Sequence, residues 1–441
     1  MTINSFKNKK VLVMGLGLQG GGVGSALYFA KAGAQVTITD LKTEKQLEPS
    51  LKLLKNYSFK YVLGRHDLAD FLNSDLIVKN PDVSWDSEYI KKAQKKSIPI
   101  EMEESLFVKM SPSKIIGITG TRGKSTVSKL VYEVLKNNQK RVFLGGNMKG
   151  SRTLELLSQT SRKDWVVLEL SSWQLSAFTK SPHISLITNL YPDHLNRYGS
   201  MTKYIKDKKN IFRFQKVSDY LLLNYENETT RKFATETKSK VIFFKKNDWP
   251  KDWPLKILGT HNISNAAAVW KLAQLLGLDN EITRKTIQDF SGLDYRLQKV
   301  REINGRQFIN DSTSTTPIAT IAAIKSFPPG SIILLLGGND KSLPLQELLE
   351  EIKKRVKYVV LLKGSGTERL LTLLKKDPQL AQRFSPVFSD YRKAVKLASS
   401  KAKRGETVLL SPGFTSFAMF NNEFERAEKF NLYAQELKTK I

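Results

Sequence analysis

The sequence predicts an α/β protein made of three consecutive α/β domains, and two observations carry this prediction. Short apolar runs recur along the chain, each followed by Gly, Ser or Asp and mostly by a helical segment, as in βαβ units. Two of these runs lead into glycine-rich loops that open helices, at 15–20 and 117–126. At 441 residues the chain is too long for a single hydrophobic core. We expect domains at 1–111, 112–297 and 298–441.

The first glycine loop follows a buried strand at 11–15. Gly15, Gly17 and Gly20 fit the spacing GxGxxG, and the next strand ends at Asp40. This is the dinucleotide fingerprint, in which a pyrophosphate lies at a helix N-terminus and an acid faces a polar group. Taken alone the pattern indicates NAD. The alternative is a set of packing glycines beside an ordinary strand-end acid.

The second glycine loop, GITGTRGKST at 117–126, follows another apolar run and opens a helical pattern. Its glycines let backbone N–H groups approach phosphate oxygens at a helix start. Lys124 is placed to reach the β- and γ-phosphates of a nucleotide, and Ser125 to bind Mg²⁺. Ile118 stands where the standard phosphate loop has glycine, so a tight strand-to-helix turn is the alternative. We expect the chain to use ATP.

The other apolar runs complete the three predicted sheets. Expected strands lie, in chain order, at 36–39, 76–81, 98–102, 166–172, 184–190, 306–312, 331–338, 358–364 and 407–413. A helix with a polar start is expected at 259–277, where Asn262 and Asn265 are either ligand contacts or helix caps. Because ligands bind at the carboxyl ends of strands in open α/β sheets, the polar residues after each run are the candidate site residues.

Composition narrows the class of protein. The chain has no cysteine, which excludes disulfides and thiolate metal sites and agrees with a cytoplasmic protein. No apolar stretch approaches the roughly 20 residues of a membrane span. The net charge of +29 is dispersed over short lysine runs without an aromatic-interleaved strip, so we expect no nucleic-acid partner.

Several strand-end motifs together resemble those of the Mur ligases, the ATP-dependent amide-forming enzymes of peptidoglycan precursor synthesis. They are GTRGKST (120–126), LELSSWQLS (168–176), NLYPDHLNRYGS (189–200), GTHNISNAAA (259–268), LDYR (293–296), INDSTSTTPIAT (309–320), LGGNDKS (336–342) and LSPGFTSFAMF (410–420). Each is modest evidence, but their order along the whole chain is specific. The resemblance is closest to the member that adds D-glutamate.

The resemblance implies a Rossmann-like first domain that holds a UDP-sugar rather than NAD. It further implies a P-loop ATPase-like central domain that binds ATP, and a Rossmann-like C-terminal domain that binds the amino acid. The expected reaction joins D-glutamate to UDP-N-acetylmuramoyl-L-alanine through an acyl phosphate, with two Mg²⁺ ions. We expect a cytoplasmic monomer.

Three alternatives remain open. The first is a Mur-type ligase that adds a different amino acid, and the second is a ligase similar to folylpolyglutamate synthase. The roughly 110 residues before the second glycine loop argue against the latter, which has its loop near the chain start. From a different class, a basic nucleic-acid-binding ATPase would need a basic strip and a base-stacking surface.

The resemblance also implies roles for individual residues. The catalytic residues are Lys124, His194 and Lys208. The expected ATP contacts are Gly120, Thr121, Arg122, Gly123, Lys124, Ser125, Thr126, Asn265, Arg296 and Asp311. The expected contacts of the UDP-linked substrate are Gly15, Gly17, Gly20, Asp40, Asn147, Ser171 and Gln174, with a plain helix cap as the alternative for Ser171. The amino acid is expected to contact Thr315, Lys341, Ser416 and Phe417, and Mg²⁺ to contact Ser125, Glu169, His194 and Lys208.

Lys208 is expected to act as a carbamate. Tyr204 precedes it by four residues, the spacing of the Tyr-x-x-x-Lys segment that follows Asp-His in the family. A lysine beside Mg²⁺ has the wrong sign of charge, and addition of CO₂ converts it into an anionic oxygen ligand. Lys209 is the register-shifted alternative.

The sequence departs from the family pattern in three places. The first glycine loop is about two residues longer than is usual in the family. Thr313 stands where a lysine is usual, and Glu423 stands where a phenylalanine is usual, with Phe424 one residue late. The last two positions belong to the amino-acid pocket.

Overall fold

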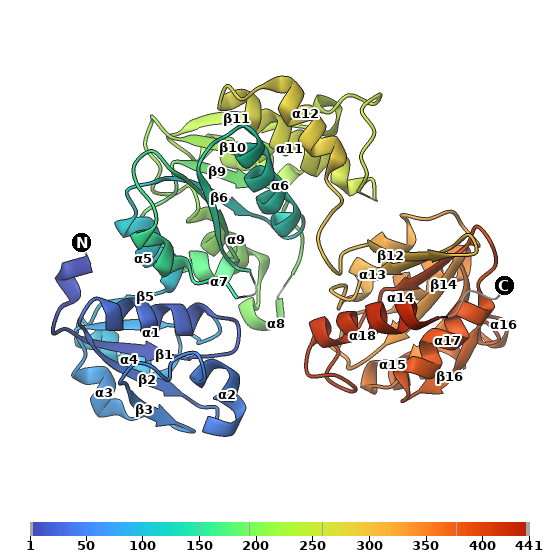
Figure 1. The fold of residues 1–441 in the computed structure, drawn as a ribbon, viewed down its shortest axis with the longest axis horizontal. Helices are drawn as coiled ribbons and strands as arrows, with labels where there is room; N and C mark the ends of the chain where they lie inside the picture. Colours follow the sequence, from blue (N-terminus) through green and yellow to red (C-terminus); the bar gives the residue numbers. More distant parts are fainter. Residues whose placement is uncertain (1–2, 149, 194, 258, 376, 438–441) are drawn as a thin grey trace. The chain divides into compact units, whose positions relative to one another are not determined.

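The computed structural model describes residues 3–148, 150–193, 195–257, 259–375 and 377–437 (Figure 1). Three sheets lie in order along the chain, one in each of the three predicted ranges. The chain divides into two compact units, Met1–Trp253 with Ser264–Gln288, and Pro254–Ile263 with Asp289–Ile441. The first two sheets belong to the first unit and the third sheet to the second. The predicted three-sheet α/β architecture is confirmed.

The first sheet has the order β3-β2-β1-β4-β5, with every neighbouring pair parallel. Its strands are β1 (Lys10–Met14), β2 (Gln35–Asp40), β3 (Lys60–Leu63), β4 (Leu76–Lys79) and β5 (Ile100–Glu101). Its helices are α1 (Gly21–Lys31), α2 (Glu44–Leu51), α3 (Leu68–Leu72), α4 (Glu88–Lys95) and α5 (Glu103–Met110), after a 3₁₀ turn at Ile3–Phe6. β1 is buried from its second residue onward, as expected for a parallel strand covered on both faces.

The second sheet has the order β11-β10-β9-β6-β8-β7 and is also parallel throughout. Its strands are β6 (Lys114–Thr119), β7 (Val142–Gly146), β8 (Trp165–Glu169), β9 (Ile184–Ile187), β10 (Tyr220–Asn224) and β11 (Lys240–Phe244). The helices are α6 (Lys124–Asn137), α7 (Ser172–Leu175), α8 (Leu195–Tyr198), α9 (Met201–Lys209), α10 (Glu228–Lys232), α11 (His261–Leu275) and α12 (Asn280–Asp289). Short 3₁₀ segments lie at Thr153–Ser158, Phe233–Thr235 and Lys246–Asp248. One hydrophobic cluster contains buried residues of both the first and second sheets, which explains why they form one unit.

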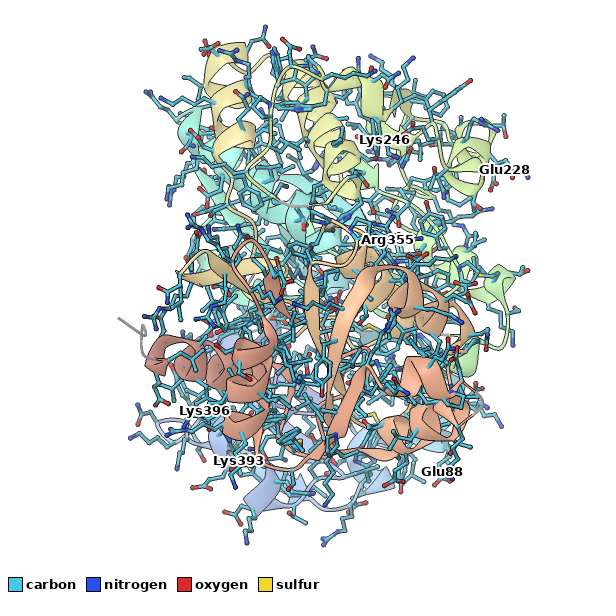
Figure 2. The ribbon with its side chains drawn as sticks, turned by 90° about the vertical axis from the view of Figure 1, so that its right-hand side faces the viewer. Glu88, Glu228, Lys246, Arg355, Lys393 and Lys396 are labelled. Atoms are coloured by element: carbon cyan, nitrogen blue, oxygen red, sulfur yellow. The ribbon has the colours of Figure 1, made fainter. Side chains whose placement is uncertain are left out.

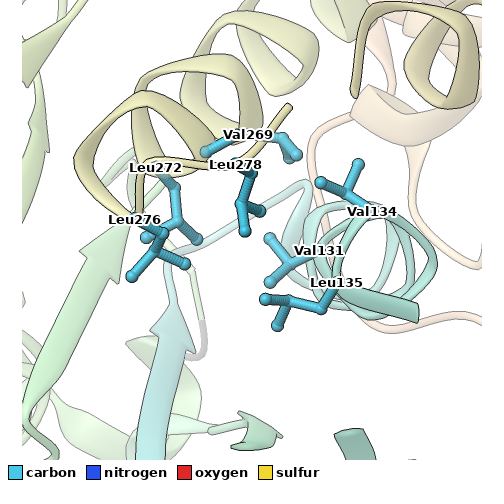
Figure 3. A pocket seen from close by; sticks show the side chains of 8 residues that line it. Val131, Val134, Leu135, Val269, Leu272, Leu276 and Leu278 are labelled. Atoms are coloured by element: carbon cyan, nitrogen blue, oxygen red, sulfur yellow. The ribbon is translucent and has the colours of Figure 1, made fainter. Parts of the chain in front are cut away.

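Helices α6 and α11 lie side by side across an apolar seam (Figure 3). The seam is lined by aliphatic side chains of both helices and of the turn after α11: Val131, Val134, Leu135, Val269, Leu272, Ala273, Leu276 and Leu278. None of these residues is polar, so the seam is a packing contact and no predicted site residue lies in it. This packing fixes the second glycine loop and Asn265 relative to each other, because α6 begins in that loop and α11 carries Asn265.

The third sheet has the order β12-β13-β17-β14-β15-β16. Its strands are β12 (Gln298–Ile303), β13 (Arg306–Asn310), β14 (Ile332–Gly337), β15 (Val356–Leu362), β16 (Phe384–Phe388) and β17 (Thr407–Leu410). Its helices are α13 (Pro317–Ile324), α14 (Gln346–Arg355), α15 (Ser365–Leu374), α16 (Pro378–Ala381), α17 (Tyr391–Lys401) and α18 (Glu423–Glu436). β12 pairs antiparallel with β13, whereas the βαβ pattern predicted only parallel strands here. Asn304 and Gly305, with φ of 50° and 72°, form the two-residue turn that this hairpin needs.

Charged side chains lie on the helices and loops that surround each of the three sheets. Figure 2 labels examples, including Lys246 after β11, Arg355 at the end of α14, and Lys393 and Lys396 on α17. Within the described ranges no helix is long and apolar enough to cross a membrane.

Candidate active site

The second glycine loop joins β6 to α6 and is held by the end of β9. Thr188 donates its hydroxyl to the carbonyl of Arg122 at 2.6 Å, and Asn189 accepts from the Arg122 N–H at 3.0 Å. Gly123 has a left-handed φ of 82°, and a Cβ there would lie 2.5 Å from Oδ1 of Asn265. The loop therefore requires glycine where it meets α11, and the structure brings the predicted Asn265 against it.

Two predicted lysines converge on this loop. Nζ of Lys124 donates to the carbonyls of Gly120 and Thr121, both at 3.1 Å. Nζ of Lys208 donates to the same Gly120 carbonyl at 2.9 Å and to the Thr119 hydroxyl at 3.1 Å. Burial, reinforced by the nearby Lys124 charge, holds the pKa of Lys208 well below its usual range. The depressed pKa favours the neutral amine of Lys208, so Lys124 is the charged member of the pair, and its ammonium suits a polyanionic ligand.

Arg122 adds a second cation to the loop, and burial lowers its pKa from the usual value. Ser125 and Thr126 are half-buried in the first turn of α6, where helix N–H groups have no intrahelical partner. Thr121 is buried, and its hydroxyl lies 3.1 Å from that of Tyr204. The predicted phosphate-loop residues thus occupy one continuous turn at the helix start.

Glu169 has the carboxylate that best fits the predicted role of a metal ligand. It ends β8, is 2% exposed, and accepts from Nδ2 of Asn147 through Oε1 at 3.1 Å. Its Oε2 is buried and has no hydrogen-bond partner among the described residues. An unsatisfied buried carboxylate oxygen is costly unless a cation or donor occupies the space beside it.

A complete metal site does not follow from carboxylates and histidines alone. Within the described residues no three His, Asp or Glu side chains cluster as a ready-made cation site. His194, predicted as a metal and acyl-phosphate contact, lies outside the described residues. The donors that the described part supplies are therefore Glu169, Ser125 and, if converted to an anion, Lys208.

The first glycine loop joins β1 to α1, and its three glycines have different physical roles. Gly15 has a φ of 87°, and a Cβ there would lie 2.7 Å from Cβ of Asn80. The N–H of Gly17 donates to Oδ2 of Asp40 at 3.1 Å. Asp40 also accepts from the Lys42 N–H at 2.9 Å, so its carboxylate closes the loop.

Gly20 contacts the second sheet's part of the unit. Its φ is 106°, and a Cβ would lie 3.0 Å from the carbonyl carbon of Gly150 and 3.0 Å from the Ser151 oxygen. The Gly150 N–H donates to the carbonyl of Gln19 at 2.9 Å. Gly150 and Ser151 therefore touch the first loop, while Asn147, shortly before them in the chain, contacts Glu169. The structure brings three predicted substrate contacts, Gly20, Asn147 and the loop around Gly17, into one neighbourhood.

Ser171 and Gln174 form a capping box at the start of α7. The Ser171 hydroxyl accepts from the Gln174 N–H at 3.3 Å, and Oε1 of Gln174 accepts from the Ser171 N–H at 2.9 Å. Gln174 is 4% exposed and its side chain also bonds Glu104, whose pKa burial raises to about 7. Ser171 is thus the N-cap residue of α7, as the helix-cap alternative predicted.

The remaining predicted residues lie in the second unit. Asp311 accepts from the Leu297 N–H at 3.2 Å and from the Ser411 hydroxyl at 2.8 Å. Burial raises the pKa of Asp311 to about 6, and the charge of nearby Arg296 opposes this rise. These two predicted ATP contacts therefore lie close to each other.

The predicted amino-acid contacts follow strands of the third sheet. Nζ of Lys341 donates to the Thr315 hydroxyl at 3.1 Å. Ser416 is buried, whereas the Phe417 side chain is 66% exposed. The hydroxyl of Thr313, where the family usually has lysine, donates to the carbonyl of Tyr295 at 3.0 Å. Lys341 is thus the predicted pocket residue that carries a positive charge.

Two arginines that the sequence did not single out organise these regions. Arg197 in α8 donates to the carbonyls of Pro81 and Asp82 at 2.9 and 3.0 Å and stacks 3.9 Å from the ring of Trp173. It thereby joins the turn after β4 to α7 and α8. It lies inside the motif NLYPDHLNRYGS, but nothing in its spacing marks it as a bridge between sheets.

The second is Arg426 of α18, which is 1% exposed. It donates to the Ser312 hydroxyl at 3.0 Å and to the carbonyls of Ser312 and Phe414 at 2.9 and 3.3 Å. It thereby joins the ends of β13 and β17. The only sequence signal is a single arginine on the apolar side of a helix.

Comparison with known proteins agrees with this geometry. The family models "Mur ligase MurD-like, N-terminal domain", "Mur ligase middle domain" and "Mur ligase, glutamate ligase domain" match residues 9–101, 118–273 and 295–414. The UDP-N-acetylmuramoylalanine–D-glutamate ligase of Roseiflexus sp. (strain RS-1) is 37% identical, over 96% of this chain and 97% of that protein. The enzyme of the same name from Borreliella burgdorferi (strain ZS7) is 36% identical, over 98% of each chain.

Solved structures share the fold at lower identity. The UDP-N-acetylmuramate–alanine ligase MurC of Thermotoga maritima has a TM-score of 0.64 and 20% identity, over 98% of this chain and 100% of that one. The MurF ligase of the same organism, solved in complex with ADP, has a TM-score of 0.59 and 16% identity, over 99% and 97%. The full-length similarity to the curated relatives, with a domain match on each of the three sheets, shows that the chain belongs to the Mur ligase family.

Proposed function

We propose that the chain is an ATP-dependent ligase that joins D-glutamate to UDP-N-acetylmuramoyl-L-alanine, releasing ADP and phosphate. One observation carries the proposal: Lys124 and Lys208 both donate to the Gly120 carbonyl, and the charge of Glu169, whose Oε2 is buried and unsatisfied, acts on Lys208. Polyphosphate charge complements the lysines, and a hard divalent cation complements Glu169. Relatives named for this reaction support the choice of substrates.

The proposed reaction has two steps. The carboxylate of the alanyl group attacks the γ-phosphorus of ATP, so that ADP leaves and an acyl phosphate forms. The amine of D-glutamate then attacks the acyl carbon, and phosphate leaves as the amide forms and the amine loses a proton. In this chain Lys124 and the N–H groups of the loop hold phosphate charge, which is the main contribution that phosphoryl transfer needs.

We propose that Glu169, Ser125, His194 and Lys208 hold Mg²⁺, which when bound neutralises phosphate charge. The oxygen donors fit this ion, and the unsatisfied Oε2 of Glu169 supports the assignment. Lys208 fits as a carbamate, because its depressed pKa favours the neutral amine that adds to CO₂. The anionic carbamate would also face the Lys124 ammonium, whose charge disfavours a protonated Lys208.

We propose that the first glycine loop takes the UDP part of the substrate, with Gly15, Gly17, Gly20, Asp40, Asn147, Ser171 and Gln174 around it. Asp40 accepts from two backbone N–H groups, those of Gly17 and Lys42, and so holds the loop beside the proposed UDP position. Calorimetry on the whole chain is expected to detect binding of UDP or the UDP-sugar and none of NAD. Micromolar NAD binding without an effect of UDP would contradict this assignment.

We propose that Arg296, Asp311 and Asn265 contact ATP together with the loop residues from Gly120 to Thr126. Thr315, Lys341, Ser416 and Phe417 are proposed to contact the amino acid. The proposed domains are 1–111, 112–297 and 298–441, in a cytoplasmic monomer. The Lys341–Thr315 pair supports an acidic amino acid, because a cation with a hydroxyl suits a carboxylate.

One assay tests the function as a whole. Phosphate release from ATP is expected to require UDP-N-acetylmuramoyl-L-alanine and an amino acid together, with D-glutamate preferred over a panel of D- and L-amino acids. A preference for a neutral or basic amino acid would favour a Mur-type ligase of different specificity. Stimulation by folate or by nucleic acid without the UDP-sugar would reject the proposal.

A further inference from the structure

The loop that carries Lys341 is fastened at one end by the backbone. Asn339 and Thr415 exchange backbone hydrogen bonds of 3.0 and 3.1 Å, which ties the loop to the segment that carries Ser416. Beyond Lys341, Ser342 has a φ of 56°, a conformation that residues other than glycine adopt at a cost. A strained, exposed turn of this kind persists only when neighbouring groups hold it.

Arg369 on α15 supplies that support from both sides of Lys341. Its Nη1 donates to Oδ2 of Asp340 at 2.7 Å, and its Nη2 donates to the carbonyl of Leu343. The Asp340 N–H also donates to the hydroxyl of Ser365, at the start of the same helix, at 3.1 Å. One planar guanidinium thus spans the residue before Lys341 and the residue two positions after it, a geometry that a lysine cannot reproduce.

The charge of Arg369 matters as well as its shape. Asp340 is next to Lys341 in the chain, so an unpaired Asp340 carboxylate would attract the Lys341 ammonium and repel an incoming carboxylate. The ion pair with Arg369 neutralises Asp340 and directs it toward α15, while Lys341 contacts Thr315. Neutralising Asp340 and directing it toward α15 both leave the Lys341 ammonium beside Thr315, where it can meet a carboxylate.

We propose that Arg369 is a positioning residue that sets the affinity for the amino-acid substrate by fixing Lys341. The inference rests on the proposed function, since Lys341 is the proposed contact of the substrate carboxylate. Arg369 itself is not proposed to touch the substrate. Its removal is therefore expected to change one Michaelis constant and leave the chemistry of the acyl phosphate intact.

The test is steady-state phosphate release by the full chain at saturating ATP and UDP-N-acetylmuramoyl-L-alanine, with D-glutamate varied. Arg369→Met is expected to raise the KM for D-glutamate about 5- to 10-fold, with kcat changed less than about twofold. The KM values for the other two substrates should not change, and Arg369→Lys should lie between Arg369→Met and the wild type.

Arg355 provides a matched control in the same unit (Figure 2). It pairs with Glu351 at 3.3 Å and its side chain is 32% exposed, against 35% for Arg369. Arg355→Met removes a similar ion pair that has no contact with the Lys341 loop. It should leave the KM for D-glutamate unchanged, and a rise equal to that of Arg369→Met would overturn the inference.

A double-mutant cycle removes the ambiguity of single variants. Asp340→Ala removes the other partner of the contact, so the double variant should be no worse than the more impaired single variant. Independent effects that multiply would overturn the inference. If Arg369→Met does not fold, an unchanged D-glutamate KM in both Arg369→Lys and Asp340→Ala would overturn it instead.

The proposed function and this inference fail in different ways. A wild type without amino-acid-dependent phosphate release would reject both. A wild type that prefers another amino acid would revise the substrate, and the inference would then be judged on the KM for that amino acid. A normal wild type with an unchanged amino-acid KM in Arg369→Met would overturn the inference alone.

Discussion

The two glycine loops of the first unit share one local architecture and have opposite electrostatic surroundings. Each leaves a buried parallel strand, β1 or β6, and opens a helix. A carboxylate faces the loop at 15–20, where Asp40 accepts from the N–H of Gly17. The loop at 117–126 instead contains the cations Arg122 and Lys124, and Lys124 donates to the Gly120 carbonyl.

The difference shows that a glycine loop at a helix start does not define its ligand. The loop supplies backbone N–H groups in both places, and the surrounding side chains decide how much negative charge the site tolerates. The second loop suits a triphosphate, whereas one N–H of the first loop, that of Gly17, already donates to the carboxylate of Asp40. This is why GxGxxG alone is weak evidence and why Lys124 is strong evidence.

The largest expected effect comes from removing a cation of the second loop. Lys124→Ala is expected to lower ATP turnover at least about 100-fold, because it removes a direct contact with charge that develops in the transition state. Lys129→Ala in the same helix removes a lysine that pairs with Glu133 and should leave turnover unchanged. ADP formation measured for both variants decides, and near-normal turnover in Lys124→Ala would refute the phosphate-loop assignment.

A second lysine, Lys208, tests whether the site beside the loop gains a negative charge when CO₂ adds to this side chain. Lys208→Ala is expected to lower activity about 10- to 100-fold, the size of losses seen when the surroundings of a metal are altered. Short carboxylic acids should restore part of it, and depleting CO₂ should lower wild-type activity, because the buried neutral amine would lose its partner. Lys209→Ala, which removes the exposed pair with Glu236, is the control.

Full activity of Lys208→Ala, or a loss that carboxylic acids do not relieve, would argue against a carbamate. Loss in Lys209→Ala alone would indicate that the register is shifted by one residue. Phosphate release at fixed pH with and without added bicarbonate provides the measurement.

The last prediction concerns the first loop and is one of stability, with no loss of activity expected from the folded protein. Gly20→Ala is expected to lower the free energy of unfolding by roughly 3 kcal/mol, since its φ excludes other residues and the Cβ would meet the backbone of Gly150 and Ser151. Gly150→Ala has a φ of 74° but nothing within 4 Å of its Cβ, so about 1 kcal/mol is expected. Urea unfolding compares the two, and equal losses would show that the close contact is unimportant.

Much of the fold could be predicted because its strands are buried on both faces. Continuous apolar runs such as β6, β8 and β14 predict buried strands by their hydrophobicity. The polar residues at or after the ends of these strands include Lys124, Glu169 and Lys341, which were therefore candidates for the site. Strand β12 was missed because QKVREI is an edge strand with mostly polar, half-exposed residues, and its hairpin breaks the parallel pattern. Strands β3, β7, β10, β11 and β16 were also missed, although β10 is a buried apolar run like those that were predicted.

Contacts that depend on tertiary structure could not be predicted from the sequence. The pairing of Gly20 with Gly150 joins residues far apart in the chain, and no spacing rule connects them. The same is true of Arg197, whose partners lie more than a hundred residues earlier, and of Arg369, whose role depends on the path of one loop. Sequence motifs indicate which chemical groups are present, whereas their supports are set by packing.

The contacts between the first and second sheets have a consequence for how the unit unfolds. Arg197 holds the turn after β4, Trp85 donates to the Ser176 hydroxyl at 2.8 Å, and Glu103 accepts from the Leu154 N–H at 3.1 Å. Elements that share such contacts and one hydrophobic cluster open cooperatively, so amides in β1 and β6 should exchange with solvent at similar rates. Residues 1–111 expressed alone would leave Glu103 and Trp85 without these partners. The isolated segment would thus be less stable than the same residues in the whole chain.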